Sequence, residues 1–219
     1  MGQQRIEIDK EFPFPVSDLF NHLSEHENLS ALFEEGHARD VDGLLSDAAF
    51  APDDRQTPAA VLIAVTDRPK PGVLLTQRPN DMRDHPGQVA FPGGKIDKTD
   101  NGAVDAALRE ASEEIGLPRD AAEVIGTIDA YETGTGFRIQ PIVALIDDGF
   151  IPVPDPYEVE AAFEPPLSFL MNPDNFQTHT GVWGGAERKY YAIPWQGHHI
   201  WGATAGMLKS LADRLAAVR

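Results

Sequence analysis

The spacing of apolar residues along the chain predicts a mixture of strands and helices. Residues 59–66, AAVLIAVT, form an apolar run of the length of a buried strand. Strand-like runs also occur at residues 72–77, 123–131, 138–146, 159–164, 175–183 and 188–194. Helices are expected at about residues 102–115 and at 204–217, where one stripe gathers Met207, Leu208, Leu211 and Leu215. Many strands with few helices predict an α+β fold, in which a mixed β-sheet lies between helices.

The beginning of the chain has a different pattern. Between residues 10 and 35, acids separate apolar residues at helical spacing, namely Leu19, Phe20, Leu23, Leu29, Leu32 and Phe33. Residues 51–58, APDDRQTP, are polar and rich in turn-forming residues, as is typical of a linker. We therefore expect a helical extension over residues 1–55 and a main domain over residues 56–219 that includes the C-terminal helix. The extension could cover a substrate site, form a homodimer or cap the sheet.

The helix expected at residues 102–115 separates apolar from acidic side chains. At about 100° per residue, its core stripe consists of Val104, Ala107, Leu108, Ala111 and Ile115. Glu110, Glu113 and Glu114 gather on the opposite side. Gly116 and Pro118 end the helix, so the three carboxylates lie near the negative end of its dipole.

Two interpretations of these acids are open. A solvated acidic face is the simpler one, because exposed like-charged pairs cost only about 0.2–0.5 kcal/mol each. A cation site is favoured by Gly93 and Gly94, where backbone can approach a ligand closely, and by Arg109, which can pair with one of the acids. Carboxylates suit Mg²⁺ or Mn²⁺. Zinc is disfavoured, since the chain has no cysteine and only scattered histidines.

The composition restricts the function further. The net charge of −17 argues against a nucleic-acid partner, because proteins that bind phosphate backbones present a basic face. A small anionic substrate is compatible with this charge if arginines or metal ions supply local positive charge. No apolar run approaches membrane-spanning length, and the chain does not start with an apolar signal core. We expect a cytoplasmic protein with no membrane partner.

Residues 109–117 read R-E-A-S-E-E-I-G-L. This segment resembles the second half of the Nudix box, G-x5-E-x7-R-E-U-x-E-E-x-G-U, where U is aliphatic. The first half departs from the box, because the interval from Gly94 to Arg109 is one residue longer and the loop contains Asp97 and Asp100 but no Glu. The resemblance implies the Nudix fold and a Nudix diphosphatase that cleaves a nucleoside diphosphate linked to a further group.

The same resemblance implies roles for individual residues. Glu110, Glu113 and Glu114 correspond to metal ligands, with the carbonyl of Gly94 as a further ligand and Mg²⁺ or Mn²⁺ as the ion. Arg109 would orient the carboxylates, and it joins Glu113 and Glu114 in the catalytic set. Divalent ions bridge the oxygens of a diphosphate and lower the pKa of a bound water, which provides a nucleophile near neutral pH.

A second motif precedes the box. Residues 74–94, LLTQRPNDMRDHPGQVAFPGG, resemble the coenzyme A diphosphatase motif L-L-T-x-R-[SA]-x3-R-x3-G-x3-F-P-G-G, with Pro79 in place of Ser or Ala. Arg78 and Arg83 of this motif suit phosphate recognition through paired hydrogen bonds. For either arginine, an ion pair with Asp81 or Asp84 is an equally good interpretation.

The branch resemblance extends from about residue 55 to the end of the chain. It places Phe137 and Arg138 on the nucleotide side of the substrate and implies hydrolysis of coenzyme A or acyl-coenzyme A to 3′,5′-ADP and (acyl-)4′-phosphopantetheine. The alternatives are a Nudix diphosphatase for ADP-ribose, dinucleotides or oxidised nucleotides, and a non-catalytic domain that senses a nucleotide.

A fourth acid is expected to join the site as a further ligand or as the general base. Glu158, which precedes a predicted strand, is the candidate. Glu132, Glu160 and Glu164 compete with it, since a base must be placed by geometry first.

Overall fold

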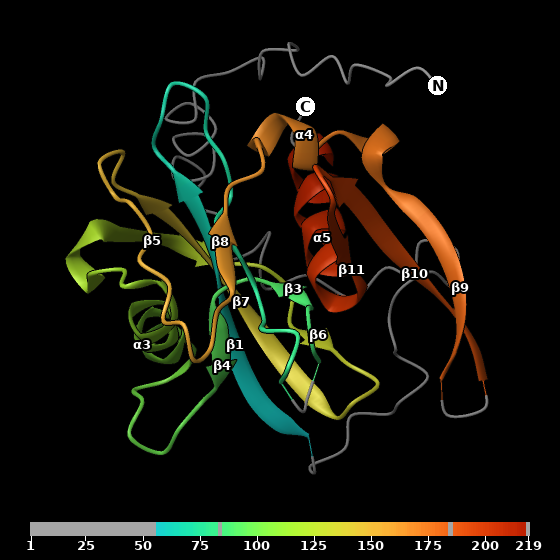
Figure 1. The fold of residues 1–219 in the computed structure, drawn as a ribbon, viewed down its shortest axis with the longest axis horizontal. Coiled ribbons are helices and arrows are strands. Elements are labelled where there is room, and N and C mark those ends of the chain that lie inside the picture. The colour runs from blue at the N-terminus through green and yellow to red at the C-terminus, as the bar shows by residue number, and fades with distance from the viewer. Residues whose placement is uncertain (1–55, 83–84, 184–185, 218–219) are drawn as a thin grey trace.

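The computed structural model describes residues 56–217 except 83–84 and 184–185. The helical extension expected over residues 1–55 lies outside the described residues, so the proposed division of the chain stays a prediction. The described part consists of a central sheet with helices on both faces and two smaller sheets beside it (Figure 1).

The central sheet is mixed, as predicted. β1 (Thr57–Thr66) and β7 (Phe137–Ile146) pair in parallel along their full length. β4 (Gly93–Lys95) adds antiparallel to β1, while β5 (Ala122–Thr127) and β6 (Tyr131–Glu132) add antiparallel to β7. A parallel pair covered on both faces is apolar throughout, which explains the continuous apolar run in β1.

Two three-stranded sheets flank the central one. The first has the order β3-β2-β8, with β2 at Leu75–Gln77, β3 at Val89–Ala90 and β8 at Ala161–Phe163. The second has the order β11-β10-β9, with β9 at Gln177–Trp183, β10 at Ala186–Trp195 and β11 at His198–Trp201. The predicted strands at residues 72–77 and 159–164 are therefore shorter than expected.

The helices cover opposite faces of the central sheet (Figure 1). α3 (Ala103–Ile115) packs on the side chains of Ala60, Leu62 and Ala64, while α5 (Gly202–Ala217) packs on the face that carries Ile63 and Val65. Successive residues of a strand point to opposite faces, so β1 serves both layers. The other helical segments among the described residues are short, namely η1 (Arg119–Ala121), α4 (Leu167–Leu170) and η2 (Pro173–Asn175). The predicted α+β fold with the sheet between helices is confirmed.

The core face of α3 differs from the predicted stripe. Val104 is 39% exposed and Leu108 is only partly buried, whereas Ala106 and Glu114 are buried. The buried face is thus rotated toward Glu114, and the expectation that all three glutamates oppose the core is wrong. Three of the buried positions are alanines, Ala106, Ala107 and Ala111, whose small side chains let this face of the helix pack closely on the sheet.

Candidate active site

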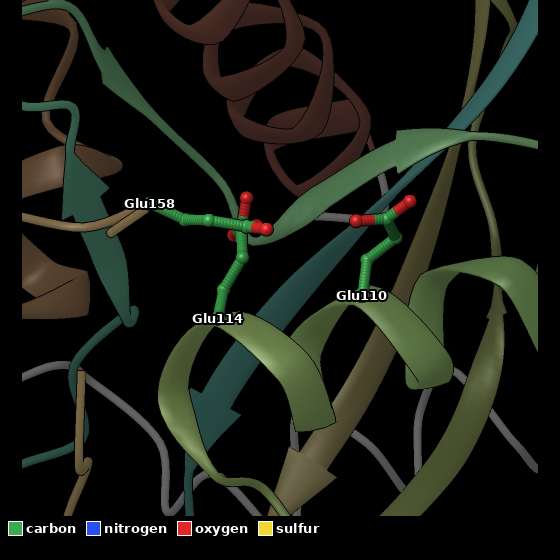
Figure 2. A group of neighbouring side chains, drawn as sticks. All are labelled: Glu110, Glu114 and Glu158. Carbon is green, nitrogen blue, oxygen red and sulfur yellow. The ribbon is translucent and has the colours of Figure 1, made fainter. Parts of the chain in front are cut away.

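Three carboxylates from two distant segments meet beside α3. One oxygen from each of Glu110, Glu114 and Glu158 lies within 4.8 Å of the others (Figure 2). Glu110 and Glu114 are one helical turn apart and therefore share a side of α3. Glu158 reaches them from the loop before β8. We call this group the carboxylate cluster.

Burial makes the carboxylate cluster electrostatically costly. Glu114 is 6% exposed, and this burial raises its pKa from 4.5 to about 8, with the nearby Glu110 and Glu158 adding to the effect. A hydrogen bond from the Gly93 N–H to Glu114 Oε2, 3.3 Å long, opposes the shift. Burial likewise raises the pKa of Glu110, against its hydrogen bond with Arg109. Close, partly buried carboxyl oxygens fit a hard divalent cation such as Mg²⁺ or Mn²⁺. Such an ion would offset both the burial of the charged carboxylates and the repulsion between them.

Glycine brings β4 against the cluster. Gly94 pairs with Ala60 of β1, and a Cβ at Gly94 would overlap the carboxylate of Glu110. At Gly93, a Cβ would overlap the backbone of Ala60 and Val61. The double glycine therefore lets backbone lie directly beside two acids of α3.

Glu113 takes a different position. Its carboxylate is exposed and accepts a hydrogen bond of 2.9 Å from Arg109 Nη1, which also donates to Glu110 Oε1 at 3.0 Å. The other edge of the guanidinium binds Asp100, with Nε 2.9 Å from Oδ1 and Nη2 3.0 Å from Oδ2. Arg109 thus connects the loop before α3 to two of its glutamates, and its orienting role stays a prediction.

The loop acid Asp100 was not assigned a role from sequence. The arginine holds its pKa below the ordinary value through their hydrogen bonds. Asp100 also accepts a hydrogen bond from the Asp97 N–H and closes the turn between the two residues. Their three-residue spacing is the sequence signal that could have indicated this structural role.

Arg78 follows β2 directly and lies close enough to the cluster for its charge to oppose the burial-driven rise in the pKa of Glu114. Its Nε is buried and has no hydrogen-bond partner among the described residues. Its backbone N–H donates to Gln88 O at 3.0 Å, which closes the hairpin between β2 and β3. Within the described part of the chain, Arg78 forms no ion pair with Asp81, while Arg83 and Asp84 lie outside it.

The other candidate acids are bound elsewhere. Glu160 accepts a hydrogen bond of 2.9 Å from Asn80, and Glu164 pairs with Arg68. Glu132 lies in β6 opposite Arg138. Of the four acids considered for the fourth position, Glu158 is the one that the described structure brings to Glu110 and Glu114.

Phe137 and Arg138 begin β7. They pair with Thr57 and Pro58 of β1, which lie three and two residues before Ala60, the neighbour of Gly94. Phe137 is partly buried and Arg138 is exposed. Their assignment to the nucleotide side stays a prediction.

Comparison with known proteins identifies the family. The sequence profile described as the NUDIX domain matches residues 56–184. The chain belongs to the Nudix family. It is 40% identical over 162 residues to the uncharacterized Nudix hydrolase NudL of Klebsiella pneumoniae strain 342, an alignment that covers 74% of this chain and 84% of that protein. With NudL of Escherichia coli K12, also uncharacterized, it shares 42% identity over 159 residues, 70% of this chain and 80% of that protein.

Among solved structures, the Nudix hydrolase RenU from M. smegmatis aligns with a TM-score of 0.49 and 20% identity, over 81% of this chain and 97% of that one. The family assignment rests on the domain match and the NudL relatives. As a Nudix hydrolase, the chain acts on phosphorus-containing anhydrides, with a pyrophosphate as substrate. Nudix enzymes generally use divalent metal ions, and the carboxylate cluster offers suitable ligands. Among the described residues, no helix has the length and apolar character needed to cross a membrane.

Proposed function

We propose that this Nudix hydrolase cleaves the diphosphate of coenzyme A or acyl-coenzyme A to 3′,5′-ADP and (acyl-)4′-phosphopantetheine. Water adds to one phosphorus, the bond from that phosphorus to the bridging oxygen breaks, and two phosphate monoesters form. The position of Arg78 carries the proposal: in an otherwise acidic chain, its guanidinium is near enough to the carboxylate cluster to oppose the rise in the pKa of Glu114, and its buried Nε has no hydrogen-bond partner among the described residues.

The motif at residues 74–94 gives this arginine its context. The motif begins one residue before β2, includes the β2–β3 hairpin and ends at the double glycine beside Glu110 and Glu114. Guanidinium groups bind phosphate oxygens through paired hydrogen bonds. Arg78, together with Arg83, is therefore proposed to bind substrate phosphates, and Phe137 and Arg138 to line the nucleotide.

The other residues of the site are proposed to bind the metal, orient its ligands and accept a proton. Glu110, Glu114 and Glu158 are proposed to hold the metal with the Gly94 carbonyl, and Glu113 would complete the set after leaving Arg109. A bound Mg²⁺ or Mn²⁺ supplies positive charge to the diphosphate and acidifies water at neutral pH. Arg109 orients the carboxylates, while Glu158, the most exposed acid of the cluster, accepts the proton of the attacking water.

A substrate comparison tests the proposal. Purified protein with Mg²⁺ or Mn²⁺ is incubated separately with coenzyme A, dephospho-coenzyme A, an acyl-coenzyme A and ADP-ribose, and the products are identified by mass spectrometry. We expect 3′,5′-ADP from coenzyme A at a higher kcat/KM than hydrolysis of dephospho-coenzyme A or ADP-ribose. Intact coenzyme A alongside AMP released from ADP-ribose would contradict the proposal and favour the alternative substrate class.

The arginine is tested by a matched pair of variants. Arg78→Ala should lower kcat/KM for coenzyme A by about 10- to 100-fold, because a charged hydrogen bond to phosphate is worth about 1.5–3 kcal/mol. Arg119→Ala removes an exposed arginine that pairs with Asp105, and it should leave kcat/KM unchanged. Equal activity of the two variants would remove Arg78 from substrate binding.

A further inference from the structure

The segment that carries Glu158 has an unusual sequence. Residues 151–157 read I-P-V-P-D-P-Y, with proline at every second position. Proline fixes φ near −65° and has no N–H to donate. We call residues 151–157 the proline strap. Its N–H groups therefore belong to Ile151, Val153, Asp155 and Tyr157.

The strap is bound to the end of α3. The Val153 N–H donates to Ile115 O and the Asp155 N–H donates to Glu114 O, both at 2.9 Å. The last carbonyls of a helix have no partner within the helix, so the strap satisfies two of them. One of these carbonyls belongs to Glu114 itself, so the backbone of the strap is fixed to a residue of the carboxylate cluster.

Asp155 then turns the chain toward the cluster. Its Oδ1 accepts the Tyr157 N–H at 2.9 Å, and its carbonyl accepts the N–H groups of Glu158 at 3.1 Å and Val159 at 2.8 Å. Val159 is 2% exposed and anchors the far side of the turn in the core. The next residue, Glu160, donates its N–H to Gln77 O at 2.8 Å. The backbone on either side of Glu158 is thus held by hydrogen bonds, to α3 on one side and to β2 on the other.

We propose that Asp155 is a positioning residue that holds Glu158 opposite Glu110 and Glu114 before any ion arrives. The proposal rests on the proposed metal role of the carboxylate cluster. Residues that orient metal ligands commonly change metal affinity by 10- to 100-fold when they are lost. Because Asp155→Ala removes a single hydrogen bond and leaves the prolines of the strap in place, we expect a smaller change than that range, about three- to tenfold.

Manganese binding by the metal-free full-length chain tests the proposal without any substrate. Titration with Mn²⁺, followed by electron paramagnetic resonance, should give a Kd for Asp155→Ala that is about three- to tenfold higher than for the wild type. Asp155→Asn keeps an Oδ1 acceptor and should stay within about twofold of the wild type. An unchanged Kd in Asp155→Ala, or an equal loss in Asp155→Asn, would overturn the proposal.

A double-variant cycle shows whether Asp155 acts through Glu158. In a Glu158→Gln background, Asp155→Ala should cause no further loss of Mn²⁺ affinity, because the group that it positions is already gone. Additive losses would overturn the positioning role. A normal Kd in Glu158→Gln alone would overturn the proposed metal role of Glu158 as well, whereas a raised Kd there with a normal Asp155→Ala defeats only the present inference.

A second variant keeps the test decisive if Asp155→Ala does not fold. Pro154→Ala with Pro156→Ala leaves every hydrogen-bonding group of the strap in place and should increase only the freedom of its backbone. It should raise the Kd about two- to fivefold in the wild-type background and cause no change in Glu158→Gln. Pro173→Ala, in η2, is the matched control and should bind Mn²⁺ normally. Equal Kd values for the double-proline variant and the control would contradict a role for the strap.

Discussion

Arg109 donates hydrogen bonds to both carboxylate oxygens of Asp100, with Nε 2.9 Å from Oδ1 and Nη2 3.0 Å from Oδ2. The third guanidinium nitrogen, Nη1, donates to Glu110 and Glu113. A bidentate contact fixes the plane of a guanidinium as well as its position. Asp100 therefore determines how Arg109 presents itself to the acids of α3.

Asp100→Ala should allow the guanidinium of Arg109 to leave its observed orientation. We expect kcat to fall about 10- to 100-fold, the range typical when a group that orients metal ligands is lost. Asp97→Ala is the matched control, because the Asp97 carboxylate is exposed and 3.9 Å from Arg109 Nη2. Steady-state kinetics of both variants check the prediction, and similar rates for the two would exclude an orienting role for Asp100.

Part of the fold could be predicted because local signals were strong. The apolar run of β1 and the Gly116 stop of α3 give both elements to within a few residues. The strands β3, β4 and β11 have two, three and four residues, too few to establish a period. The strand predicted at residues 123–131 is two strands, β5 and β6, which pair separately with β7.

The acids of the site could be named from sequence, but the positions that they take relative to one another could be predicted only in part. The spacing of Glu110 and Glu114 is local, so their shared side of α3 follows from sequence. The orientation of α3 about its own axis depends on its packing against β1. The sequence pattern does not give this orientation, so it predicts that Glu113 lies on the same side as Glu110 and Glu114. Glu158 reaches the cluster through hydrogen bonds between the proline strap and the end of α3, which no local pattern encodes.

The stability of the metal-free protein should fall as pH rises. Burial raises the pKa of Glu114 from 4.5 to about 8 in the folded state. Between these values the folded state keeps a proton that the unfolded state releases, so each step up in pH favours unfolding. From pH 5 to pH 8 the loss in unfolding free energy should be on the order of a few kcal/mol.

Urea denaturation at several pH values measures this slope in protein treated with a chelator. Saturating Mn²⁺ should flatten it, because an ion in the cluster stabilises ionised Glu114 and binds only the folded state. A stability that is constant or rises between pH 5 and pH 8 without metal would contradict the assigned pKa direction.

Glu114→Gln should separate activity from stability. The amide keeps the size of the side chain but carries no charge, so we expect turnover to be lost while the metal-free variant is more stable than the wild type above pH 7. Thermal unfolding and product formation check the two effects. Glu113→Gln should also abolish turnover, as expected for the catalytic set, but its exposed position predicts no gain in stability. Near-normal turnover in either variant would remove that residue from the mechanism.

Gly94→Ala tests the close approach of β4 to α3. The added Cβ would overlap the carboxylate of Glu110, whose side chain must then leave the cluster. We expect kcat to fall at least about 10-fold and Mn²⁺ to bind more weakly, since one ligand is displaced. Overpacking of this kind costs about 1–3 kcal/mol, so circular dichroism should still show a folded protein at 25 °C. Gly149→Ala, whose Cβ would meet only Asp147 Oδ1 at 3.1 Å, controls for the methyl group itself. If Gly94→Ala turns over as fast as this control, Glu110 does not need its observed position for catalysis.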